Sequence, residues 1–255
     1  MQTVNSQRLF GIALGSFLLY FLLSFSISKP LTTGEIERLY AQKIEILRTT
    51  SSPRIFILAG SNGRFSHSCA VMHRETGRNC GNLSIAAGLG LDFLFSSYLR
   101  YFREGDVVYL PLEFEQYALE RNEVYSGPDN TILLKSERDL LFGLGWRRVA
   151  RAFFYGDERY FIQGLVETGL ARKGVKRRFS EASINEFGDQ QGHTPESAQE
   201  YRNFVLTQKQ SIPDLSKIAP ASFSNDLVVD FLKNAKNKGV TVIGGLPTTF
   251  SDSET

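Results

Sequence analysis

The segment Ser52–Phe65, Ser-Pro-Arg-Ile-Phe-Ile-Leu-Ala-Gly-Ser-Asn-Gly-Arg-Phe, predicts a strand that ends in a tight turn. Arg54–Ala59 is a short, mostly apolar run between a proline and a glycine, which is typical of a buried strand in a parallel sheet. Gly60–Gly63 follows as a glycine-bounded turn that carries Ser61, and a helix is expected at Arg64–Glu75. This arrangement favours either nucleophilic chemistry at the serine or a plain turn in which Ser or Asn caps the helix.

The pattern of strand and helix continues beyond this turn. Strands are expected at Asn79–Ala87 and Asp106–Leu112, with a helix at Leu91–Phe102 between them. A later helix at Ser222–Lys238 precedes a fourth strand at Gly239–Ile243. Alternating strands and helices with short connections predict right-handed βαβ units and a parallel sheet with helices on both faces. The expected fold class is therefore α/β, with a doubly wound, mainly parallel sheet.

Three residues each follow a predicted strand directly: Ser61, Gly88 and Glu113. In open parallel sheets, ligands bind beyond the carboxyl ends of the strands. A helix that begins at the serine turn would add free N–H groups where an oxyanion could form. We therefore expect the three residues to line one crevice.

The N-terminal region predicts a membrane anchor. Leu9–Ser28 contains 20 residues without a charge, which matches the length needed to span a bilayer. Ser26–Pro30 is a poor site for signal peptidase, so residues 1–30 are interpreted as an uncleaved, single-pass signal anchor. The positive charges on the two sides of the span are nearly balanced and do not set its orientation.

Two further segments complete the expected organisation. Thr32–Thr49 has apolar residues at helical spacing and is interpreted as a helical stalk within a linker at 31–52. Residues 53–255 form the predicted α/β domain, with a helical insertion at about 114–210 that includes expected helices at Ser136–Phe154 and Asp157–Arg172. The basic run Arg172–Arg178 is either a solvated surface or, beside an anchor, a contact with lipid headgroups.

Composition excludes several functions. A net charge of +2 provides no electrostatic basis for binding nucleic acid. The turn at Gly60–Gly63 lacks the Gly-Lys-Ser/Thr ending of a phosphate-binding P-loop. His, Cys and acidic residues show no metal-ligand spacing, and we expect neither a metal nor a cofactor. Cys69 and Cys80 can either form a disulfide or remain two buried thiols, because sequence does not give their separation.

Three short motifs follow one another between residues 57 and 113. Ile57–Asn62 carries a serine after a glycine, Asn82–Gly88 ends in a glycine, and Tyr109–Glu113 ends in a carboxylate. In this order they resemble the first three blocks of the SGNH (GDSL-like) hydrolase superfamily, in particular its membrane-anchored, cell-envelope branch. The resemblance covers Arg54–Glu113 well and Gly239–Pro247 weakly.

This resemblance implies a flavodoxin-like fold and a serine esterase or O-acyltransferase that acts on an acylated envelope polysaccharide or a small acyl donor. It places the nucleophile at Ser61 and an oxyanion N–H at Gly88. Glu113 occupies the position where the superfamily usually carries an asparagine donor. The resemblance also implies that the globular part lies outside the cytoplasm, on the periplasmic side.

The sequence departs from the superfamily pattern at two points, and these departures lead to an alternative function. A carboxylate at Glu113 repels an oxyanion unless it is protonated or has another task, such as orienting a base. The superfamily's late Asp-x-x-His block is not found before Thr255, and His193 is the histidine that could fold over the site. The chain is therefore expected to be incomplete at its C-terminus and inactive by itself. The alternative function is a membrane-tethered binding or scaffold protein of the same fold.

Overall fold

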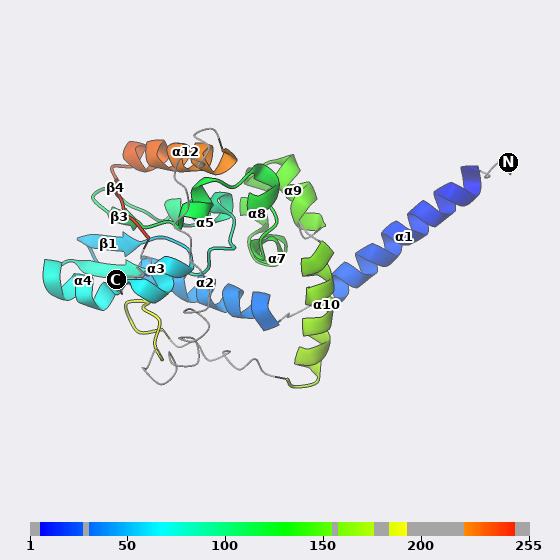
Figure 1. Cartoon of the computed structure of the whole chain (residues 1–255), viewed down its shortest axis with the longest axis horizontal. Coiled ribbons are helices and arrows are strands. Elements are labelled where there is room, and N and C mark those ends of the chain that lie inside the picture. Colours follow the sequence, from blue (N-terminus) through cyan, green and yellow to red (C-terminus); the bar gives the residue numbers. More distant parts are fainter. Residues whose placement is uncertain (1–5, 28–30, 155–157, 176–183, 193–221, 248–255) are drawn as a thin grey trace, which may run out of the picture.

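The computed structural model describes residues 6–27, 31–154, 158–175, 184–192 and 222–247. An α/β domain lies at one end, and the helix α1 (Ser6–Ser26) projects from it (Figure 1). Within α1, no residue of Ser6–Ser24 is buried, and this stretch is long and apolar enough to cross a membrane, by length and composition alone.

The sheet has four strands, each of four residues: β1 (Arg54–Ile57), β2 (Asn79–Asn82), β3 (Val107–Leu110) and β4 (Thr241–Gly244). All neighbours pair in parallel, in the order β2-β1-β3-β4. The predicted parallel α/β sheet flanked by helices is thus confirmed. The strand expected at Asn79–Ala87 ends early, because the Asn82 side chain accepts a hydrogen bond from the Ser84 N–H and turns the chain out of the sheet (3.0 Å).

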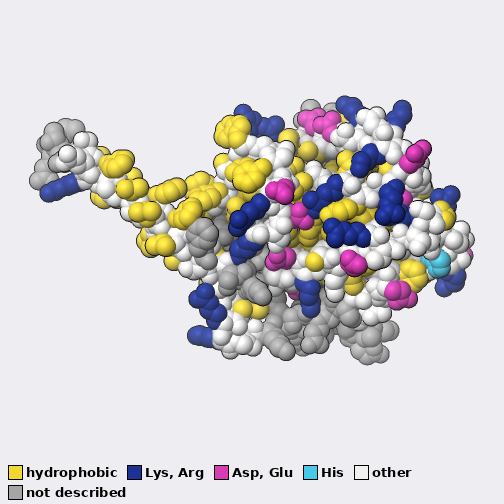
Figure 2. Space-filling view, turned by 180° about the vertical axis from the view of Figure 1, so that it is seen from behind, with side chains coloured by type: hydrophobic (Ala, Val, Ile, Leu, Met, Phe, Trp, Pro, Cys, Tyr) yellow, Lys and Arg dark blue, Asp and Glu magenta, His cyan; other side chains and the backbone are white. Residues whose placement is uncertain are grey.

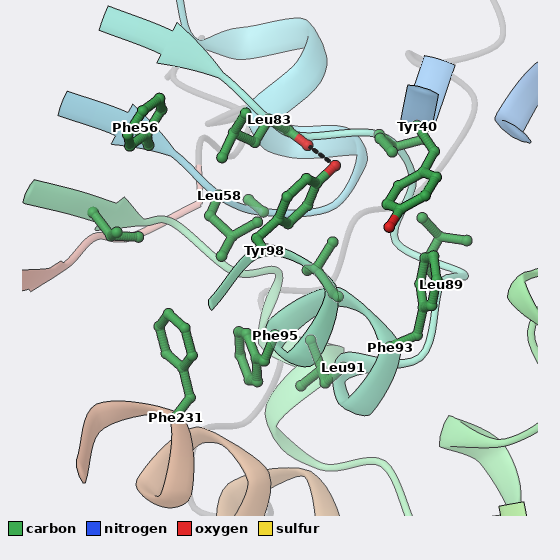
Figure 3. Close-up of a cluster of buried hydrophobic side chains, with 14 of the residues drawn as sticks. Tyr40, Phe56, Leu58, Leu83, Leu89, Leu91, Phe93, Phe95, Tyr98 and Phe231 are labelled. Carbon is green, nitrogen blue, oxygen red and sulfur yellow. Dashed lines mark hydrogen bonds between the residues drawn. The ribbon is translucent and has the colours of Figure 1, made fainter. Parts of the chain in front are cut away.

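One face of the sheet carries the main hydrophobic core (Figure 3). Phe56 of β1 packs there with residues of three helices: α2 (Leu31–Thr49), α5 (Leu91–Leu99) and α12 (Phe223–Asn237). The rings of Phe95 and Phe231 stack 4.3 Å apart, and Leu39 and Leu47 of α2 are fully buried. The segment that the sequence suggests as a stalk is therefore helical, but it packs as a layer of the domain.

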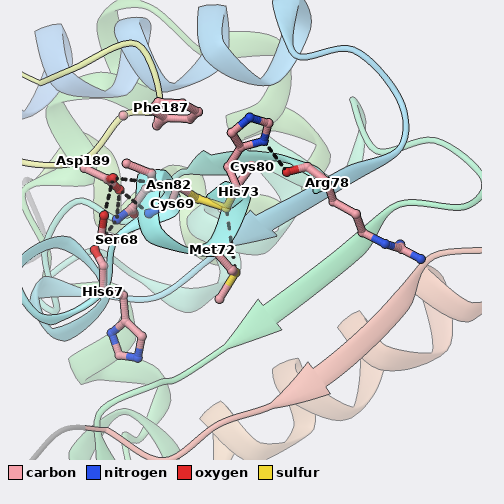
Figure 4. Close-up of a disulfide and its surroundings, with 12 residues drawn as sticks. His67, Ser68, Cys69, Met72, His73, Arg78, Cys80, Asn82, Phe187 and Asp189 are labelled. Atoms are coloured by element: carbon pink, nitrogen blue, oxygen red, sulfur yellow. Dashed lines mark hydrogen bonds between the residues drawn. A yellow bond between two sulfur atoms is a disulfide. The ribbon is translucent and has the colours of Figure 1, made fainter. Parts of the chain in front are cut away.

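The opposite face carries a smaller cluster built around a disulfide (Figure 4). Cys69 of α4 (Cys69–Thr76) is bonded to Cys80 of β2, with 5.1 Å between their Cα atoms. Ile57 of β1 is the third buried member of this cluster. The disulfide, one of two states that the sequence leaves open, fastens α4 to the edge strand.

Two helices expected from the sequence are each divided. In place of one helix at Arg64–Glu75, the structure has α3 (Ser61–Ser66) and α4, because His67 takes an extended conformation. The helix expected at Ser136–Phe154 is interrupted at Gly145, whose φ of +93° is strained for other residues. The other elements are η1 (Phe114–Tyr117), α6 (Arg121–Val124), α7 (Asp129–Lys135), α8 (Arg138–Gly143), α9 (Trp146–Phe153) and α10 (Glu158–Arg172).

Candidate functional site

Gly60 makes the turn between β1 and α3 possible. A Cβ atom at this position would lie 2.6 Å from the Ala87 Cα atom and 2.6 Å from Glu113 Oε2. Real Cβ atoms do not approach other heavy atoms so closely, so only glycine fits without a shift of its neighbours. This packing brings the loops that follow β1, β2 and β3 into contact with one another and places Ser61 at their junction.

The hydroxyl of Ser61 and the carboxylate of Glu113 are in direct contact. Ser61 Oγ donates to Glu113 Oε1 at 3.1 Å, and the Asn62 N–H donates to the same oxygen at 2.6 Å. The second oxygen, Glu113 Oε2, is buried and accepts no hydrogen bond from the described residues. A buried acceptor without a partner is costly, so it requires an explanation in function or in a ligand.

Gly88 lies on the same side of the sheet but makes different contacts. Its neighbour Ala87 packs on Gly60, whereas the exposed Gly88 lines the rim of a cavity of about 130 Å³ together with Pro128. Glu167 of α10, which also lines this cavity, accepts hydrogen bonds from the Thr32 N–H and hydroxyl. The structure thus brings Ser61 and Glu113 together and puts Gly88 one residue away from the packed turn.

No histidine among the described residues contacts the serine. His67 places Nδ1 3.5 Å from the Asn62 carbonyl oxygen, and its ring lies 5.5 Å from that of Tyr109. His73 Nδ1 lies 2.7 Å from the Arg78 carbonyl oxygen on the far end of α4. His193, the candidate base, lies outside the described residues.

A buried polar network, which the sequence motifs do not predict, holds α3 and α4 after the turn. Asp189 accepts hydrogen bonds from Ser68 Oγ (2.9 Å), the Cys69 N–H (2.7 Å) and the Ala70 N–H (2.9 Å), and so caps the start of α4 (Figure 4). Asn82 connects this cap to α3, because its Nδ2 atom donates to the Gly63 carbonyl at 3.0 Å.

Lys43 of α2 belongs to the same network. It is fully buried and donates to the carbonyl oxygens of Asn82 and Gly188. Burial lowers the pKa of the Lys43 ammonium to about 7; the charge of Arg64 lowers the pKa too, and that of Asp189 opposes the shift. The burial of Lys43 could have been predicted from the sequence. Residues 36, 40, 43 and 47 share one stripe of the helix, and the other three members of this stripe are apolar.

Comparisons with known proteins returned nothing: no family model, curated protein or solved structure matches this chain. Among the described residues, no group of three or more His, Cys, Asp or Glu side chains is arranged to hold a metal ion. The contact of the Ser61 hydroxyl with the Glu113 carboxylate is therefore the feature that bears most directly on chemical function.

Proposed function

We propose that this protein is a membrane-anchored, SGNH-like serine esterase or O-acyltransferase of flavodoxin-like, doubly wound topology. Its substrate is an acylated envelope polysaccharide or a similar acyl donor, and its domain lies on the periplasmic side. The proposal rests above all on one observation: the Ser61 hydroxyl, at the start of a helix beyond a parallel strand, donates to Glu113 at 3.1 Å.

Glu113 is proposed as the proton acceptor for the serine. A general base must lie within about 2.6–3.2 Å of the group whose proton it takes, and Glu113 Oε1 meets this condition. As Ser61 Oγ bonds to the acyl carbonyl carbon, its proton passes to the carboxylate. The protonated Glu113 then returns this proton to the departing alkoxide, and water or an acceptor hydroxyl takes the acyl group from the serine by the reverse sequence.

This role also addresses the electrostatic conflict at Glu113. A carboxylate beside an oxyanion is repulsive, but Glu113 becomes neutral in the same step in which the oxyanion forms. The N–H groups of Ser61 and Gly88 are the proposed donors to that oxyanion. In the resting state, the negative carboxylate is held by the serine hydroxyl and the Asn62 N–H.

A non-catalytic, membrane-tethered binding protein is the second candidate. One observation favours it: the Ser61 hydroxyl and the Asn62 N–H are both already bound by the protein's own carboxylate. In that case, Glu113 is a fixed cap of the turn, and a ligand would occupy the neighbouring cavity without being transformed.

Hydrolysis of an aryl acetate by the full chain in detergent micelles distinguishes the two candidates. With Glu113 as the base, the enzyme proposal departs from the inactivity expected from the absent Asp-x-x-His block. It expects turnover by the parent and by the control Ser66→Ala, in which an exposed serine of the same helix is removed. It expects Ser61→Ala and Glu113→Gln to reduce the rate to the level of the background reaction. Equal rates for the parent and Ser61→Ala would favour the binding protein. Full activity of Glu113→Gln beside an inactive Ser61→Ala would move the base to another residue.

A further inference from the structure

Large apolar side chains are exposed on α8, α9 and α10, of which α9 and α10 contact α1. Phe142 of α8 is 68% exposed, Trp146 of α9 is 75% exposed and Phe154, directly after α9, is 52% exposed. On α10, Ile162 and Val166 are 59% and 58% exposed and stand one helical turn apart. These five residues are called the apolar face below. Monomeric domains rarely expose so many large apolar side chains together without a partner.

The apolar face is continuous with the candidate membrane helix. Tyr20 of α1 stacks on Phe161 with ring centroids 4.9 Å apart, and its hydroxyl donates to the Phe153 carbonyl at 3.2 Å. Phe17 and Phe21 also lie against the Phe153 ring, at 6.3 and 5.4 Å. Figure 2 shows hydrophobic side chains continuing from α1 onto the domain. Any bilayer that surrounds α1 therefore meets α9 and α10.

The position of these contacts along α1 gives the depth at which α9 lies within the bilayer. The apolar span ends at Ser24, and Phe17 and Tyr20 precede that residue by about 10 Å and about 6 Å along the axis, at about 1.5 Å per residue. Interfacial amphipathic helices bury their apolar side by about 5–10 Å at the boundary of headgroups and acyl chains. Phe153, which contacts both rings, is held at this depth by α1 itself.

Basic side chains surround the apolar face. Arg147 is exposed and holds its guanidinium 5.6 Å from the Trp146 ring centroid. Arg159 lies exposed in the first turn of α10, and Arg172 and Lys173 lie exposed at its end. Tryptophan and arginine together are suited to the boundary between acyl chains and anionic headgroups, because each has an apolar body and a polar tip.

We propose that the apolar face of α8–α10 inserts into the headgroup and acyl-chain boundary of the bilayer that α1 enters, with the surrounding basic residues bound to anionic lipid headgroups. The inference rests on the anchor in the proposed function and is independent of the chemistry at Ser61.

Docking in this orientation determines what the candidate site faces. Ile27, directly after α1, and Gly88 line the same cavity. The loops at the carboxyl end of the sheet therefore lie beside the point where the chain leaves the membrane. A domain held down by α8–α10 therefore keeps this edge of the sheet close to the bilayer surface.

Trp146 is the only tryptophan of the chain and therefore reports directly on the contact. The full chain is reconstituted into vesicles of phosphatidylcholine and phosphatidylglycerol, with acyl chains either unlabelled or brominated near the headgroup. The proposal expects the fluorescence of Trp146 to lose most of its intensity in brominated vesicles. The control is the double variant W146F/L232W, which moves the tryptophan to the exposed side of α12 (Leu232 is 41% exposed) and should keep its intensity.

Three outcomes overturn the proposal. Trp146 that is not quenched would show that the apolar face stays outside the bilayer, as it would if a second copy of the chain or another protein covered it. Equal quenching of Trp146 and of the control tryptophan would indicate non-specific adsorption of the domain. Quenching that is unchanged in F142S/F154S would exclude the neighbouring apolar residues as the anchor. The matched control is F65S, since Phe65 of α3 is 51% exposed and lies outside the apolar face.

Discussion

The two ends of the paired strands β1 and β3 carry polar contacts that differ in how completely they are paired. At their amino ends, Arg54 and Asp106 form a fully buried ion pair, with Arg54 Nε 2.7 Å from Asp106 Oδ1. Each partner makes one further hydrogen bond. The Leu47 carbonyl accepts from Arg54 at 2.9 Å, and the Arg103 N–H donates to Asp106 at 2.8 Å. At the carboxyl ends, Glu113 is held by Ser61 and the Asn62 N–H, and one of its oxygens is left without a partner.

This difference separates a structural contact from a candidate functional one. A buried charge is tolerated when an opposite charge and hydrogen bonds satisfy it, as at Arg54 and Asp106. A carboxylate with unused acceptor capacity costs stability, and such costs persist where function requires them. The comparison leads to four predictions, in decreasing order of the expected effect.

Asp106→Asn should cause the largest loss of stability. It leaves the Arg54 guanidinium buried without its counter-charge, and breaking a buried pair typically costs about 3–5 kcal/mol. Urea unfolding of the full chain in micelles, followed by circular dichroism, measures the change. The control is Glu75→Gln, since the pair between Arg74 and Glu75 is largely exposed and should contribute little. Equal stability of both variants would show that the buried pair of Arg54 and Asp106 contributes no more to stability than an exposed one.

Lys43 is buried like Arg54, but its amino group donates to two carbonyl oxygens, whereas Arg54 is paired with the carboxylate of Asp106. Its pKa falls from the usual 10.5 to about 7 in the folded protein, chiefly because of burial. Between about pH 7 and pH 10.5, the unfolded chain therefore binds more protons at this site than the folded one, so the free energy of unfolding should rise with pH in this window. In the Lys43→Met variant, the free energy of unfolding should not show this increase with pH. A parent whose stability falls over the same interval would contradict the lowered pKa.

Gly60→Ala tests the close packing at the carboxyl end. The new methyl group would meet the Ala87 backbone and Glu113 Oε2 at 2.6 Å, and overpacking of this kind typically costs about 1–3 kcal/mol. It should also displace the Glu113 carboxylate and lower any hydrolysis of the aryl acetate. Gly34→Ala is the matched control, because its methyl group meets nothing within 4 Å in the helix α2. Unchanged stability and activity in Gly60→Ala would show that the turn is not tightly packed.

Glu113→Gln should have the smallest effect on stability and the opposite sign to Asp106→Asn. It removes the buried negative charge but keeps a polar atom at the position of Oε2, so the free energy of unfolding should rise only slightly, by up to about 1 kcal/mol. The same unfolding measurement applies to both variants. A loss of stability as large as that in Asp106→Asn would assign Glu113 to the structure and remove the reason to connect it with catalysis.

The sequence predicted the parallel sheet because its strands are local features. The strands β1, β3 and β4 are short, mostly apolar runs bounded by Gly, Pro or polar residues, and the helix between β2 and β3 has a clear apolar pattern. The ends of the strands were less predictable. Asn79–Ala87 is apolar enough to continue, but the side chain of Asn82 terminates the strand through a contact with Ser84.

The sequence also brought Ser61 and Glu113 to one edge of the sheet, because residues that follow parallel strands emerge on the same side. It did not determine that the two side chains touch, since this depends on the distance between two loops. It gave α2 as a helix but not its place in the core, because periodicity shows that a helix has an apolar side and not what covers it.

By itself, the sequence determined the apolar N-terminal span, the α/β order and the glycine turn that carries the serine, since each depends on neighbours in the chain. Only the tertiary structure decided which polar residues meet: Arg54 with Asp106, Lys43 with two carbonyl oxygens, Cys69 with Cys80, and Ser61 with Glu113. The partners in these pairs are between 11 and 145 residues apart, and their meeting depends on how the helices and loops pack on the sheet.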